Sequence, residues 1–132
     1  MGASGASEKG KFIAISLPGG QGGIGFDDLG FSASWHRVLV PAGQSGTLDL
    51  IDPDTRKVSS IRGFANGTMF DGGHGEGITS VDEGKEFLLV TDRTARQLDV
   101  VDPKEQCLHA AGFGAGLCAV CRRDERNLGN RA

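Results

Sequence analysis

A histidine and a glutamate lie two residues apart in a glycine-rich stretch of this sequence. The stretch reads Gly72-Gly73-His74-Gly75-Glu76-Gly77, and side chains two residues apart in an extended chain point the same way. An imidazole and a carboxylate placed in this way could ligate a metal ion or perform acid–base chemistry. One His and one Glu do not complete a metal site, so the alternative is a turn in which His74 bonds to the backbone. We therefore predict no metal ion, no cofactor and no catalytic residue.

Two adjacent carboxylates, Asp27 and Asp28, form a second candidate site. Neighbouring side chains on a strand face opposite sides, so this pair is poorly arranged for acid–base chemistry. We expect these residues to cap backbone groups or to line a channel. Asp92-Arg93 is expected to form a salt bridge at the rim or between blades, a surface feature that contributes little stability.

The three cysteines leave several alternatives open. Cys118 and Cys121 have C-x-x-C spacing, and Cys107 and His109 lie upstream. These four residues could in principle hold a zinc ion. The alternatives are a redox-active disulfide and inert thiols, and strand geometry would put Cys118 and Cys121 on opposite faces. An odd number of cysteines leaves at least one unpaired, which favours a reducing compartment.

Several classes of function lack their usual sequence signals here. The sequence contains no P-loop, no dinucleotide-binding fingerprint, no nucleophile elbow and no basic stripe with interleaved aromatic residues. The net charge of −3 implies no general attraction to nucleic acid. No apolar run approaches the roughly 18 residues of a membrane helix. We predict neither nucleic-acid binding nor a membrane span.

The elements that must position these residues come from an internal repeat. Leu48-Asp49-Leu50-Ile51-Asp52-Pro53 returns as Leu98-Asp99-Val100-Val101-Asp102-Pro103, a shift of 50 residues (98 − 48). The same shift places Val38-Leu39-Val40 on Leu88-Leu89-Val90. A fixed period of this size indicates a repeat architecture.

Each copy of the repeat consists of short apolar runs separated by turn residues. Asp52-Pro53 and Asp102-Pro103 match the first two positions of a type I turn, so we assign these four residues a structural role. Short runs of this kind predict strands. The predicted strands cover residues 27–32, 38–40, 47–51 and 57–61 in the first copy, and 77–81, 86–91, 97–101 and 107–111 in the second.

The second strand of each copy is apolar at consecutive positions. A run of that kind predicts burial on both faces of the sheet. Small four-stranded sheets stacked face to face meet this requirement in a β-propeller. We therefore predict an all-β fold: an incomplete β-propeller of two four-stranded antiparallel blades plus flanking strands.

The repeat resembles the YVTN-type β-propeller family. In that family a strand of the "-YVTN-" kind precedes one of the "-V-VID-T-" kind. The matching residues are Asp49-Leu50-Ile51-Asp52-Pro53-Asp54-Thr55 in the first copy, and Leu89-Val90-Thr91-Asp92 followed by Val100-Val101-Asp102-Pro103 in the second. The resemblance covers roughly residues 11 to 121. The Tyr and Asn of the family name are absent, and the sequence contains no Tyr.

The predicted organisation follows the repeat. Residues 1–10 are expected to form a disordered leader. Residues 11–23 are expected to form the last strand of a preceding blade, with the strand itself over 11–17, followed by a connector. Residues 24–64 are expected to form blade one, and residues 75–113 blade two. Between them, residues 65–74 are expected to form a connector in which Met69-Phe70 is a hydrophobic plug. Residues 114–132 are expected to form the start of a further blade and a frayed tail. Two blades cannot close a ring, since propellers have about four to eight.

We expect a non-enzymatic repeat module that binds a protein or ligand as part of a larger or self-assembled ring. Its expected partners are other propeller blades, through self-association, or an unknown protein. The alternative is a fragment of a propeller enzyme, a lactonase-like hydrolase or an oxidoreductase, with His74 and Glu76 in the channel. No secretory signal is visible, so a cytoplasmic location is expected by default, although similar repeats are often exported.

Overall fold

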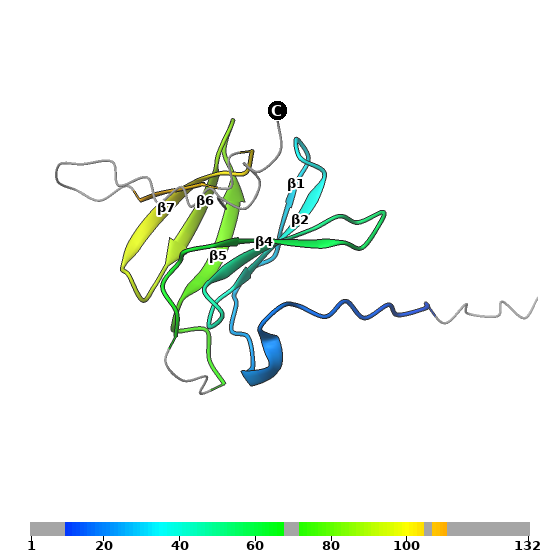
Figure 1. The fold of residues 1–132 in the computed structure, drawn as a ribbon, viewed down its shortest axis with the longest axis horizontal. Coiled ribbons are helices and arrows are strands. Elements are labelled where there is room, and N and C mark those ends of the chain that lie inside the picture. Colours follow the sequence, from blue (N-terminus) through cyan, green and yellow to red (C-terminus); the bar gives the residue numbers. More distant parts are fainter. Residues whose placement is uncertain (1–9, 68–71, 105–106, 111–132) are drawn as a thin grey trace, which may run out of the picture.

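The chain forms two antiparallel β-sheets, each with four strands in sequence order (Figure 1). The computed structural model describes residues 10–67 and 72–104, together with the backbone of 107–110. The first sheet contains β1 (Gly30–Ser32), β2 (Arg37–Ala42), β3 (Thr47–Ile51) and β4 (Val58–Arg62). The second sheet contains β5 (Ile78–Glu83), β6 (Leu88–Asp92), β7 (Gln97–Asp102) and β8 (Cys107–Ala110).

The prediction of an all-β fold with two antiparallel sheets is confirmed. The described residues contain one short 3-10 helix, η1 (Gly20–Gly22), and no α-helix. They include no helix with the length and apolar character that a membrane span requires. The first strand begins three residues later than predicted, at Gly30. The reason is that the N–H groups of Asp27 and Asp28 both donate to the carbonyl oxygen of Thr79 in β5, rather than to β2.

The strand predicted over residues 11–17 is wrong. These residues have no regular secondary structure, and Phe12 is 99% exposed. An extended segment becomes a strand only when a neighbour pairs with its backbone N–H and C=O groups. In the described part of the chain, no strand pairs with this segment. Its assignment to a preceding blade stays a prediction.

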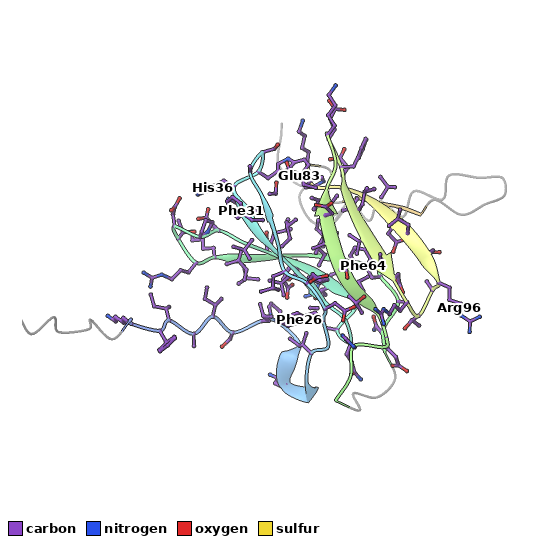
Figure 2. All side chains as sticks on the ribbon, turned by 180° about the vertical axis from the view of Figure 1, so that it is seen from behind. Phe26, Phe31, His36, Phe64, Glu83 and Arg96 are labelled. Atoms are coloured by element: carbon purple, nitrogen blue, oxygen red, sulfur yellow. The ribbon has the colours of Figure 1, made fainter. Side chains whose placement is uncertain are left out.

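The register of the first sheet places Leu39, Leu48, Leu50 and Ile61 on one face. Leu39 is paired with Leu50, and Leu48 with Ile61, and directly paired residues lie on the same side of a sheet. Their side chains pack against the second sheet, in a core that also contains Phe64. The second sheet contributes Ile78, Val81, Leu88, Val90 and Val101 to this core. Figure 2 shows Phe64 in the middle of the molecule, where the two sheets meet. Full burial of each such side chain contributes about 1.5 to 3 kcal/mol.

The two sheets differ in how many of their faces are covered. Every residue of β3 is buried, and so are the last four residues of β2. In β6, buried and exposed residues alternate, with Leu88 buried and Leu89 exposed. The prediction of burial on both faces therefore holds for β2 and is wrong for β6. We call the side of the second sheet that the described residues leave uncovered, which carries Leu89, Thr91, Leu98 and Val100, the open face.

Close backbone contacts between glycines join the two sheets beside β5. Gly43 forms an isolated antiparallel bridge with Ile78. A Cβ at Gly43 would lie 2.1 Å from the carbonyl oxygen of Gly25, and a Cβ at Gly77 would lie 2.0 Å from that of Gly43. Neither position has room for a side chain. These contacts bring residues 24–27, which precede β1, next to residues 72–77, which precede β5.

Candidate functional site

Asp27, His74 and Arg93 come together where the two sheets meet. The backbone positions two of them: the N–H of Asp27 donates to Thr79 O, and the N–H of Arg93 donates to Gly77 O, each at 2.9 Å. The Asp27 carboxylate is then held from two sides. Its Oδ2 accepts a hydrogen bond from Arg93 Nη2 at 2.7 Å, and its Oδ1 contacts His74 Nδ1.

The three side chains differ in their exposure to solvent. The Asp27 side chain is 19% exposed, whereas those of His74 and Arg93 are 59% and 49% exposed. The carboxylate therefore lies beneath the two groups that it contacts. Because His74 uses Nδ1 to contact Asp27, its Nε2 is the ring nitrogen that can meet a ligand.

His74 also lines a pocket of about 310 Å³. The remaining lining residues come from two segments that adjoin through their glycines: Ile24, Gly25 and Phe26 from one, and Gly72 and Gly73 from the other. Figure 2 shows Phe26 beside the short helix η1, away from the centre of the sheets. The pocket thus combines an imidazole whose orientation is set by a carboxylate with an aliphatic and an aromatic side chain.

Glu76 and Asp28 do not take part in the contacts of Asp27 described above. The segment before β5 runs through bends, with φ of 90° at Gly72 and 70° at Gly77, rather than as an extended strand. The spacing rule for extended chains therefore does not apply to His74 and Glu76. The Glu76 carboxylate lies close to Gly67, where a Cβ would be 2.7 Å from Glu76 Oε2. Asp28 is exposed, and its N–H donates to Thr79 O at 3.4 Å.

The aspartates of the two Asp-Pro pairs accept hydrogen bonds within their turns. Asp52 Oδ1 accepts from the N–H groups of Asp54 and Thr55, at 2.9 and 3.0 Å. The hydrogen bond from Thr55 is the main reason that the pKa of Asp52 is lowered. Asp102 Oδ1 accepts from the N–H of Lys104 at 2.8 Å. Pro53 and Pro103 occupy the next position in each turn.

The remaining chemical candidates are not grouped as a metal site would require. Within residues 10–67 and 72–104, no three His, Cys, Asp or Glu side chains are gathered around a common point. Cys118 and Cys121 lie outside the described residues, as do Met69-Phe70 and the side chains of Cys107 and His109.

Two buried carboxylates were missed as candidates, although the repeat marks them. Asp49 and Asp99 occupy equivalent positions, 50 residues apart, and both are 0% exposed. Asp49 Oδ1 accepts from Ser60 Oγ at 2.6 Å, and Asp99 Oδ1 accepts from Gln97 Nε2 at 2.7 Å. Burial raises the pKa of both carboxyl groups. The recurrence of Asp between two aliphatic residues was the signal that could have found them.

The contacts of Arg93 and Glu83 link residues that are distant in sequence. Arg93 reaches Asp27 across 66 positions. Glu83 accepts hydrogen bonds from the N–H groups of Ala33 and Ser34, at 3.0 and 3.3 Å, in the turn between β1 and β2. Figure 2 shows Glu83 near the end of the hairpin that carries His36 and Phe31. No local pattern in the sequence predicts either pairing.

Comparison of the chain with protein-family models, with curated proteins and with solved structures finds no match. Its functional interpretation therefore rests on its own residues and on their arrangement.

Proposed function

We propose that the chain is a non-enzymatic binding module whose two sheets are consecutive blades of an incomplete YVTN-type β-propeller. We further propose that it associates with a second copy through the open face of the second sheet. The 50-residue repeat and the face-to-face stacking of two four-stranded sheets support the blade assignment.

The observation that carries this proposal is a difference in exposure between equivalent leucines. Leu39 and Leu48 are 1% and 0% exposed, because they pack against the second sheet. The repeat places Leu89 and Leu98 at the same positions of the second sheet, where they are 38% and 45% exposed. The same side chains in the same register thus form a packed interface in one sheet and an uncovered surface in the other.

Uncovered apolar surface of this kind favours association. Leu98 is paired with Thr91, and Leu89 with Val100, so these side chains form one continuous patch on β6 and β7. The first sheet offers less apolar surface for a partner, because every residue of β3 is buried. We therefore expect pairing through the open face itself, with the two copies related by a two-fold axis.

Solution mass measured by light scattering tests this proposal. We expect the wild-type protein to be dimeric at a protein concentration of about 100 µM, which is high enough to populate a weak interface. The Leu98→Glu variant should be monomeric at the same concentration. The matched control is Leu29→Glu: Leu29 is 56% exposed and lies outside the strands, so this substitution should leave the mass unchanged. Three or four copies would contradict the two-fold arrangement, because a ring requires head-to-tail contacts between different surfaces. A wild-type monomer, or a mass that Leu98→Glu does not alter, would contradict it.

A further inference from the structure

We propose that the pocket beside His74 binds a small carboxylic acid with an apolar body, whose carboxylate is held by His74 Nε2. The pocket is made by residues that lie outside the open face, so this inference goes beyond the proposed association and does not depend on it.

The charges of the cluster leave room for one anion. Asp27 is a single carboxylate, and two groups that can carry positive charge, His74 and Arg93, contact its two oxygens. Arg93 is always protonated and balances the charge of Asp27. A protonated His74 then brings one positive charge that is not balanced within these three residues. A bound carboxylate would complete the balance, through a hydrogen bond in which both partners are charged.

The orientation of the imidazole suits this role. The contact of Nδ1 with Asp27 Oδ1 fixes the orientation of the ring. Rotation of the ring would break that contact, so the direction of Nε2 is set before a ligand arrives. A group that is held in place before binding loses little entropy when it binds.

The walls of the pocket indicate what the ligand carries besides its carboxylate. Ile24 and Phe26 provide aliphatic and aromatic surface beside His74. A volume of about 310 Å³ lies at the lower end of the range for small-molecule sites, about 300 to 1,000 Å³. These properties fit a small arylalkanoic or branched aliphatic acid.

The chain contains a matched control for the histidine. His36 contacts the carboxylate of Asp54 through Nε2 at 2.9 Å, and its side chain is 56% exposed, close to the 59% of His74. His36 does not line the pocket. It packs against Phe31 instead, with ring centroids 5.8 Å apart, as Figure 2 also shows. Both histidines are therefore exposed partners of an aspartate, but only one adjoins the proposed site.

The experiment is a titration of the full chain with phenylacetate, in which two-dimensional amide NMR spectra are recorded at each ligand concentration. The pH is about 6, where imidazole groups take up protons. We expect saturable shifts of the Gly73 and Gly75 amides, with millimolar affinity as is common for so small a ligand. His74→Gln should weaken binding about tenfold, the usual effect of losing a charged hydrogen bond. His36→Gln should leave the affinity unchanged.

Phenylacetamide, which has the same shape and no charge, serves as the ligand control and should bind at least about tenfold more weakly. The amide spectrum of each variant reports whether it is folded, and the exposure of both histidines makes these substitutions tolerable. Equal binding of the amide and the acid would overturn the inference. So would the absence of saturable shifts in the wild type, or equal effects of the two histidine substitutions.

Discussion

The two sheets are copies of one sequence pattern, yet they have different surroundings. Leu48 and Leu98 occupy equivalent positions in β3 and β7, and their exposed fractions are 0% and 45%. Gly46 and Arg96 occupy equivalent turn positions, and both have positive φ, 66° and 57°. The repeat therefore gives the second and third strand pairs of each copy the same register, whereas neighbouring elements decide which side chains are buried.

The sheets also differ in the polar groups that they direct at one another. Glu83 in the second sheet accepts hydrogen bonds from the turn of the first sheet, where the equivalent position is Ala33. Asp92 Oδ2 accepts from the N–H of Ala65 at 3.0 Å, and the residue equivalent to Asp92 is Ala42. Hydrogen bonding with the side chain of Ser34 is the main reason that the pKa of Glu83 is lowered. The second sheet thus supplies acceptors to the first, and the repeat does not duplicate them.

The largest expected difference between the sheets is in the cost of shortening equivalent leucines. Leu48→Ala should lower the free energy of unfolding by about 2 to 4 kcal/mol, because it leaves a cavity in the core. Leu98→Ala should lower it by less than about 1 kcal/mol, because the side chain is partly solvated. Urea denaturation of dilute protein measures both values. Equal losses would show that the two positions are buried to the same extent in solution.

A smaller difference is expected at the equivalent turn positions. Gly46→Ala should lower the free energy of unfolding by about 1 to 2 kcal/mol from its positive φ alone. A Cβ there would also lie 1.9 Å from Asn66 Oδ1. Arg96 is exposed (Figure 2), and Arg96→Gly should raise the free energy of unfolding by about 0.5 to 1 kcal/mol.

Thermal unfolding of the two turn variants measures these effects. The double variant Gly46→Ala, Asn66→Ala should recover the part of the loss that comes from the side-chain contact, and not the part that comes from φ. Stabilisation by both turn substitutions, or by neither, would contradict the equivalence of the two turns.

The smallest expected effects concern the buried aspartates. Burial raises the pKa of Asp49 and Asp99, so the folded state holds their protons more tightly than the unfolded state does. The free energy of unfolding should therefore fall as the pH rises above about 4 and through the raised pKa values. The negative charge of Asp92 raises the pKa of Asp99 further, whereas the positive charge of Arg62 lowers that of Asp49.

The comparison of Asp49→Asn with Asp99→Asn isolates these two contributions. Asp99→Asn should remove more of the pH dependence than Asp49→Asn does. Urea unfolding at about pH 4 and about pH 7 measures the difference for each variant and for the wild type. If Asp99→Asn leaves the pH dependence at its wild-type value, the assignment of the proton to Asp99 is wrong.

The sequence by itself determined the turns of this protein and most of its strands. Strand β3 coincides with the predicted range, and the Asp-Pro pairs lie in turns between strands. Alternation of apolar runs with Gly, Pro and Asp is a local property, and hairpins between neighbouring runs need no distant residue. A 50-residue repeat was sufficient to give the number of sheets.

Only the tertiary structure decided the site and the exposure of each face. The cluster of Asp27, His74 and Arg93 joins residues that are up to 66 positions apart, and it depends on close contacts between glycine backbones. The segment 11–17 has a strand-like sequence but no pairing partner among the described residues. Pairing and burial depend on what lies next to a residue in space, and a sequence pattern specifies neighbours only along the chain.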